Sequence, residues 1–208
     1  MTDKEKVLLD KINELYKKVK GEFIKEELLC SGNFLEILKE IYKMPNGVFL
    51  TKEKVVKNGG KNAVLIIAVT KENEYIITFQ TRIKDKIIAE FPAGYVEKDE
   101  TPLEAARREL LEETGYSSNN FFILDEAYTS PGIDNSTTYI IVANDCVKAE
   151  TEGKDGHEII SWGLFKDNEL DYLIDNNIMN GAMNKLAYYN FINKPRREKG
   201  NIKQLRLN

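Results

Sequence analysis

The sequence predicts an α/β protein: one domain of strands and helices, preceded by an extra helix and a β-rich extension. Residues 63–70 (AVLIIAVT) form a nearly continuous apolar run, which is typical of a strand buried on both faces. Residues 102–114 are bounded by the start and stop signals of a helix. Residues 23–56 contain short extended runs separated by turn residues. Together these segments predict the fold class.

Composition limits the classes of function. A chain of 208 residues with 42% hydrophobic content is long enough for one ordinary domain with an appendage. The net charge of −4 argues against a nucleic-acid partner. The charged N-terminus and the lack of a long apolar run predict no signal peptide and no membrane segment. Cys30 and Cys146 are far apart, so we expect ordinary buried thiols in a reducing cytoplasm rather than a disulfide. The only histidine, His157, argues against a zinc site or a Ser-His triad.

The first segments predict a helix and then strands. In residues 3–20, Leu8, Ile12, Leu15 and Val19 recur at helical spacing, and this apolar face packs either on the chain's own body or on a partner chain. Three extended runs follow, separated by turn signals that include the hairpin pair Asn-Gly. The second run also has a helical period, so a helix is the alternative there. The three runs are residues 23–30, 34–44 and 48–56.

The remaining chain predicts a domain that begins after the Asn58-Gly59-Gly60 turn. Residues 83–89 predict a loop or a frayed strand, and residues 147–158 an acidic, Gly-containing loop. The last residues, 195–208, predict a mobile basic tail. Further strands are expected at 63–70, 74–82, 121–130, 137–147 and 159–165, and helices at 102–114, 167–175 and 179–193.

The helix at 102–114 carries the chemistry. Thr101 is a good N-cap, Glu104 completes a capping box, and Gly115 is a natural stop. Its glutamates stand at i, i+3 and i+4, so their side chains converge on one patch, and like charges at that spacing repel. A divalent cation such as Mg²⁺ would remove the repulsion, because it prefers carboxylate oxygens. The three residues are Glu109, Glu112 and Glu113.

The spacing around this helix resembles the Nudix box, G-x5-E-x7-R-E-U-x-E-E-x-G-U. Gly94, Glu100 and the run from Arg108 to Tyr116 fill every fixed position. The resemblance implies the Nudix fold, with a mixed β-sheet sandwiched between helices. It also implies hydrolysis of a nucleoside diphosphate linked to another group, with Mg²⁺ as cofactor and Mn²⁺ as the alternative.

Other residues resemble the ADP-ribose pyrophosphatases within that family. Gln80-Thr81-Arg82 lacks the aromatic residue of the subfamily's Gln-aromatic-Arg, but Glu90 to Gly94 matches, and Pro131 stands fifteen residues past the box. The resemblance implies hydrolysis of ADP-ribose to AMP and ribose 5-phosphate by a homodimer. Rival functions are hydrolysis of another nucleotide sugar or a dinucleoside polyphosphate, and non-catalytic ADP-ribose binding.

The resemblance also implies the roles of individual residues. The implied metal ligands are Glu109, Glu112, Glu113 and the carbonyl of Ala93. The Ala93 carbonyl is expected to reach the metal because Gly94 lets the chain turn closely there. Arg108 pairs with Glu112 and orients it. Glu158 is the preferred base, ahead of Glu150, Glu152 and Asp155. Arg82, Pro131 and Phe34 are expected substrate contacts, with Tyr42 and Phe49 as the alternative aromatic residues for adenine. The expected domains are residues 1–57 for dimerisation and the substrate pocket, residues 58–194 for catalysis, and residues 195–208 as the tail.

Overall fold

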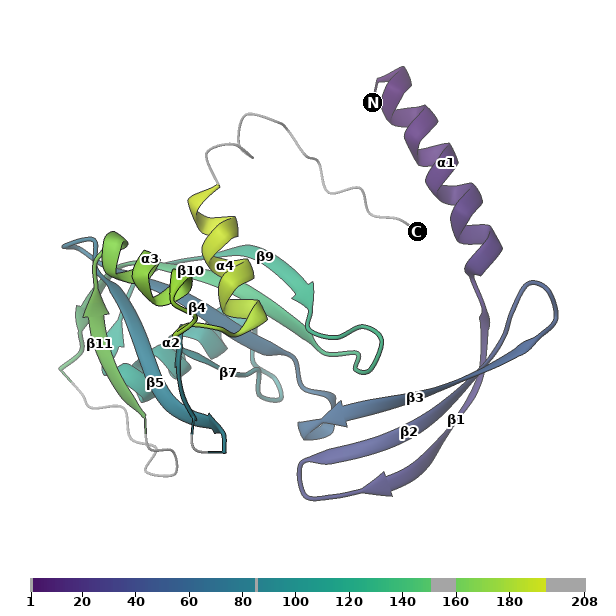
Figure 1. Ribbon diagram of the computed structural model, residues 1–208, viewed down its shortest axis with the longest axis horizontal. Helices are drawn as coiled ribbons and strands as arrows, with labels where there is room; N and C mark the ends of the chain where they lie inside the picture. The colour runs from purple at the N-terminus through teal and green to yellow at the C-terminus, as the bar shows by residue number, and fades with distance from the viewer. Residues whose placement is uncertain (1, 85, 151–159, 194–208) are drawn as a thin grey trace. The chain divides into compact units, whose positions relative to one another are not determined.

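The computed structural model describes residues 2–84, 86–150 and 160–193 (Figure 1). The chain forms two compact units. One contains residues 1–60 together with residues 130–136, and the other contains residues 61–129 and 137–208. The expected tail and the loop segment that holds His157 and Glu158 lie outside the described residues.

The N-terminal unit is a helix followed by a three-stranded antiparallel meander. Helix α1 begins at the capping box of Thr2 and Glu5 and has no buried residue. The run with the alternative helical period is a strand, β2, and the Asn-Gly turn joins it to the next strand as expected. The elements are α1 (Asp3–Val19), β1 (Glu22–Ser31), β2 (Leu35–Lys43), β3 (Phe49–Lys57) and the 3₁₀ turn η1 (Asn58–Gly60).

Residues 130–136 pack on strand β3. The Lys54 Nζ donates a hydrogen bond of 2.7 Å to the Pro131 carbonyl, and the Val55 N–H donates to the Ile133 carbonyl at 2.8 Å. Lys57 forms an ion pair of 2.8 Å with Asp134. These contacts explain why a segment that connects two strands of the second unit belongs to the first.

The second unit is a mixed sheet with helices on both faces, as predicted. Its strands run in the order β11-β5-β4-β10-β8, and β4 and β10 are parallel. In addition, β6 pairs with β5, β7 with β4 and β9 with β10. The elements are β4 (Ala63–Thr70), β5 (Tyr75–Ile83), β6 (Lys86–Glu90), β7 (Ala93–Tyr95), α2 (Pro102–Thr114), β8 (Tyr116–Ser117), β9 (Asn120–Tyr128), β10 (Thr137–Lys148), β11 (Ser161–Phe165), α3 (Asp167–Asp175) and α4 (Ala182–Ile192).

Strand β4 divides the core into two layers because successive side chains point to opposite faces of the sheet. Leu65 and Ile67 pack in the layer that also contains residues of α3 and α4. Val64, Ile66 and Ala68 pack in the layer that also contains residues of α2. The expectation of a strand buried on both faces is therefore confirmed.

The segment expected as a loop or a frayed strand contains a strand, β6, which pairs with β5 in an antiparallel hairpin. Helix α4 begins at Ala182 rather than Met179. Met179 lies in the preceding connection, where its side chain is fully buried and its N–H donates to the Leu173 carbonyl at 3.0 Å. None of the helices in the described part of the chain is both long and apolar enough to span a membrane. Cys30 and Cys146 are both free thiols, as expected, but only Cys146 is buried; Cys30 is exposed, so the expectation of a buried thiol is wrong there.

Candidate active site

Helix α2 presents the glutamates, and its ends follow the sequence signals. The Glu104 N–H donates to the Thr101 side chain at 3.3 Å, and the Glu104 carboxylate accepts from the Thr101 N–H at 2.8 Å. Gly115 ends the helix with φ of 71°, in the left-handed region that glycine adopts without strain. Leu110 and two alanines bury the opposite face in the core. The helix is therefore fixed at both ends and along one side.

The Glu109 carboxylate lies directly against the Cα atom of Gly94. A Cβ atom on residue 94 would overlap this carboxylate. Gly94 lies in strand β7, paired with Val64, and does not have a positive φ. We expected a glycine here because the chain turns closely, and that reason is wrong. Residue 94 is a glycine because any side chain there would occupy the space of the Glu109 carboxylate. The side chain of Glu109 is 15% exposed, and burial raises the pKa of its carboxyl group.

Glu113 contacts the residue before Gly94. The Ala93 N–H donates a hydrogen bond of 3.1 Å to the Glu113 Oε2. Two of the three glutamates therefore touch consecutive residues of the Ala93–Gly94 segment. This arrangement brings together three of the predicted metal-site residues, Ala93, Glu109 and Glu113.

Arg108 connects the carboxylates to one another. Its Nη1 donates to Glu109 at 2.7 Å and to Glu112 at 2.9 Å, which confirms the i, i+4 pair. Its Nε and Nη2 each donate to Glu100 at 3.0 Å, and Nη2 also donates to the Tyr95 carbonyl at 2.9 Å. Hydrogen bonding from the guanidinium lowers the pKa of Glu100. Sequence reasoning missed the Tyr95 contact, because no local pattern indicates it.

These residues offer the chemistry that a hard divalent cation requires. Their donors are carboxylate oxygens on one helix face beside a backbone segment, the type of ligand that Mg²⁺ prefers. Within the described residues, no three acidic, histidine or cysteine side chains converge as a metal cluster. Arg108 donates to Glu109 and Glu112, whereas Glu113 accepts from the Ala93 N–H. By donor type, these carboxylates fit such a cation, which would bind them alongside the guanidinium.

Arg82, the expected phosphate contact, lies on strand β5. Its Nε donates a hydrogen bond of 2.8 Å to Glu90, and the Gln80 amide donates to the same oxygen at 3.2 Å. The Arg82 side chain is 42% exposed, whereas that of Glu90 is 17% exposed. Glu90 therefore orients the guanidinium without burying it. The sequence placed an acidic residue before Pro-Ala-Gly but did not predict this pairing.

The remaining predicted residues belong to other segments of the chain. Phe34 follows the turn after β1 and is 73% exposed, so its ring does not pack in a core. Pro131 lies in the segment that Lys54 holds against β3. Both belong to the N-terminal unit. Glu158, like its alternatives Glu152 and Asp155, lies outside the described residues, whereas Glu150 is described and exposed.

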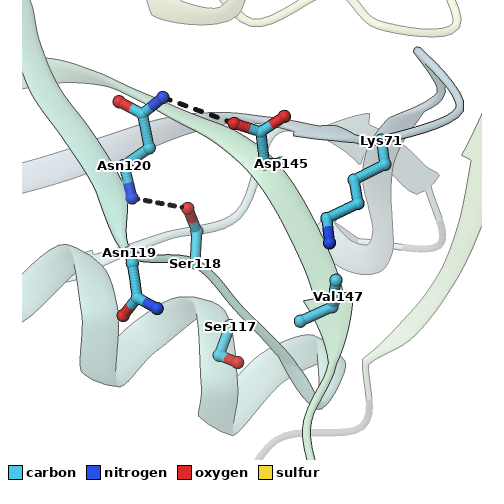
Figure 2. Close-up of a pocket in the computed structure, with 7 residues that line it drawn as sticks. All are labelled: Lys71, Ser117, Ser118, Asn119, Asn120, Asp145 and Val147. Atoms are coloured by element: carbon cyan, nitrogen blue, oxygen red, sulfur yellow. Dashed lines mark hydrogen bonds between the residues drawn. The ribbon is translucent and has the colours of Figure 1, made fainter.

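A separate pocket of about 300 Å³, lined mostly by residues with polar side chains, contains none of the predicted residues (Figure 2). It has one carboxylate, Asp145, which accepts a hydrogen bond of 3.4 Å from the Asn120 amide. The pocket therefore has one carboxylate, whereas the α2 site has several close together. Its lining residues are Lys71, Ser117, Ser118, Asn119, Asn120, Asp145 and Val147.

Comparison with known proteins adds independent information. Residues 60–183 match the sequence model of the NUDIX domain. The chain is 35% identical over 130 residues to the ADP-ribose pyrophosphatase of Bacillus subtilis (strain 168), which covers 62% of this chain and 69% of that protein. It is also 35% identical over 158 residues to the methanol dehydrogenase activator of Bacillus methanolicus, covering 74% and 84%. A crystal structure of an ADP compounds hydrolase has the same fold, with a TM-score of 0.74, 21% identity and coverage of 87% and 96%.

Proposed function

Because this chain belongs to the NUDIX family and is a pyrophosphohydrolase, we propose that it hydrolyses ADP-ribose. Water adds across the pyrophosphate bond, and the products are AMP and ribose 5-phosphate. The observation that carries the proposal is the contact of Glu109 and Glu113 with the Ala93–Gly94 segment. The relative from Bacillus subtilis, whose name is ADP-ribose pyrophosphatase, supports the choice of substrate.

The proposed cofactor is Mg²⁺, with Mn²⁺ as the alternative. Glu109, Glu112, Glu113 and the Ala93 carbonyl would hold it. A bound divalent cation supplies charge neutralisation at the pyrophosphate and lowers the pKa of a bound water. The burial of Glu109 supports this assignment, because a carboxylate that is mostly shielded from water gains most from a cation beside it.

The chain's own residues have distinct proposed roles. Arg108 orients Glu112 and Glu109 through its shared Nη1. Arg82 binds the substrate phosphates, because its guanidinium is exposed and already oriented by Glu90. Glu158 removes the proton from the attacking water. Phe34 and Pro131 are proposed as further substrate contacts.

We also propose that the chain is a homodimer of the reducing cytoplasm. Strands β1 to β3 leave many apolar side chains exposed, which is typical of an interaction surface. These include Phe23, Leu28, Leu35 and Phe49. In this proposal residues 1–57 form the dimer interface and part of the substrate pocket, residues 58–194 catalyse, and residues 195–208 are a tail. Light scattering at micromolar concentration would contradict the dimer if it gave the mass of one chain.

A product analysis tests the function. The purified protein would be incubated with Mg²⁺ and ADP-ribose, with other nucleotide sugars, or with dinucleoside polyphosphates, and the products separated by ion-exchange chromatography. We expect AMP and ribose 5-phosphate to form fastest from ADP-ribose. Faster cleavage of another substrate would reject ADP-ribose but keep the metal site. Binding of ADP-ribose without any cleavage would instead support the non-catalytic alternative.

A further inference from the structure

The connection between β6 and β7 is held from three directions. The Phe91 N–H donates to Asn184 Oδ1 at 2.8 Å, the Pro92 carbonyl accepts from Ile66 at 2.8 Å, and the Ala93 N–H donates to Glu113 at 3.1 Å. Ile66 belongs to the central strand, Glu113 to α2 and Asn184 to α4. The segment that touches the glutamates thus receives its position from elements far apart in sequence.

Asn184 completes the outer edge of strand β6. One edge of β6 pairs with β5, where Thr78 faces Glu90 and Gln80 faces Ile88. At the other edge, the Ala89 N–H donates to the Ile178 carbonyl at 3.3 Å. The next N–H on that edge, two residues on, is that of Phe91, because alternate residues of a strand point their amides the same way. The Asn184 side chain thus takes the place of a carbonyl on a neighbouring strand.

The Asn184 amide has little freedom to move. Asn184 is 5% exposed, and Phe91, whose N–H donates to it, is 1% exposed. A Cβ atom on Gly181, the N-cap of α4, would lie 2.8 Å from the Asn184 Nδ2. The absence of a side chain at residue 181 therefore leaves room for the amide. A buried amide held in this way gives a fixed position to the backbone group it binds.

We propose that Asn184 is a positioning residue for the metal site. By binding the Phe91 N–H it holds residues 91–94 where Ala93 meets Glu113 and Gly94 meets Glu109. This inference rests on the proposed metal-dependent function. Asn184 lies beyond residues 60–183, the part of the chain that matches the family model. The proposal therefore assigns a role in the site to a residue of the last described helix.

The experiment measures Mn²⁺ binding to the full chain by electron paramagnetic resonance, without substrate. Asn184→Leu replaces the asparagine by an apolar side chain of similar volume. The buried Phe91 N–H then loses its hydrogen-bond acceptor, Asn184 Oδ1. We expect Mn²⁺ to bind about 10- to 100-fold more weakly, the usual effect of losing an outer partner of a metal site. Asn184→Asp keeps an oxygen acceptor and should bind Mn²⁺ nearly as tightly as the unchanged protein, even if it is less stable.

Asn190 supplies a matched control. It is also a buried asparagine of α4, but its Nδ2 donates to Asp125 at 2.7 Å, on strand β9. Asn190→Leu should reduce thermal stability and leave the Mn²⁺ affinity unchanged. If Asn184→Leu also leaves the affinity unchanged, or if both leucine variants weaken it equally, the role of Asn184 is structural alone and the proposal is wrong.

A second variant covers the case in which Asn184→Leu does not fold. Gly181→Ala retains Asn184 but forces its amide away from the new methyl group. Weaker Mn²⁺ binding in this variant would support the proposal, and unchanged binding with an unchanged fold would overturn it. If the unchanged protein binds no Mn²⁺, the proposed metal site itself fails. If kinetic assays of the same variants change only the KM for substrate while Mn²⁺ binding stays unchanged, the positioning role is contradicted and the proposed function remains intact.

Discussion

Replacing Gly94 by alanine should damage the site by displacing Glu109 alone. The backbone of residue 94 accepts an alanine, because its φ is not positive. The new methyl group would overlap the Glu109 carboxylate, which must move by more than ~1 Å to restore ordinary contact. A misplacement of that size in a catalytic group typically lowers the rate ~10²-fold. We therefore expect kcat/KM for ADP-ribose to fall by at least that factor.

The same overlap should reduce stability. Inserting a methyl group into a packed site typically costs ~1–3 kcal/mol. If the overlap with Glu109 is the cause, the penalty should nearly disappear when Glu109 is already alanine. A double-mutant cycle of Gly94→Ala and Glu109→Ala, measured by urea unfolding without metal, should give a coupling of ~1 kcal/mol or more. Gly32→Ala is the matched control, because its Cβ would lie 3.5 Å from the Leu35 carbonyl, an ordinary contact.

Two results would refute this reasoning. Equal destabilisation by Gly94→Ala in both backgrounds would mean that another group meets the methyl. Full activity of Gly94→Ala would mean that the position of the Glu109 carboxylate beside residue 94 has no bearing on catalysis. A loss of activity in Gly32→Ala would show that glycine replacement has a general effect in this chain.

Three further predictions concern the helix and the loop. Glu113→Gln should lower turnover at saturating substrate by ~10²-fold or more, with no loss of metal-free thermal stability because one repelling charge is removed; near-normal turnover would reject Glu113 as a ligand. Thr101→Ala should lower the free energy of unfolding, measured in urea, by ~1 kcal/mol. Thr2→Ala removes the same type of cap from α1 but should leave the free energy of unfolding unchanged, because α1 buries no residue. Glu158→Gln should lower kcat ~10²-fold or more with little change in KM, and a larger effect of Glu152→Gln would identify that residue as the base.

Local signals predicted what local interactions determine. The caps Thr101 and Gly115 predicted the ends of α2, because each acts within one turn of the chain. The i, i+4 pair of Arg108 and Glu112 followed from helix geometry for the same reason. The start of α4 could not be predicted in this way, because its N-cap, Gly181, has no side-chain cap and the apolar residue before it, Met179, is buried in a connection.

Contacts between distant segments were not predictable from one sequence. The role of Gly94 depends on the Glu109 side chain, and the sequence alone suggested a turn instead. Asn184 and Phe91 are separated by 93 residues, and nothing in their local patterns connects them. The sequence therefore predicted residues that the structure brings together, Ala93, Glu109 and Glu113, but not what holds their backbone segment in place.

The site depends on both layers of the second unit. Helix α2 packs in the layer of Val64 and Ile66 and reaches residues 93–94 through Glu113 and Glu109. Helix α4 packs in the opposite layer and reaches residue 91 through Asn184. A shift of either helix would change the distance between the backbone segment and the carboxylates. The contact of residues 93–94 with the glutamates of α2 is therefore stabilised by burial on both faces of the sheet, although the residues proposed to bind the cation come only from α2 and Ala93.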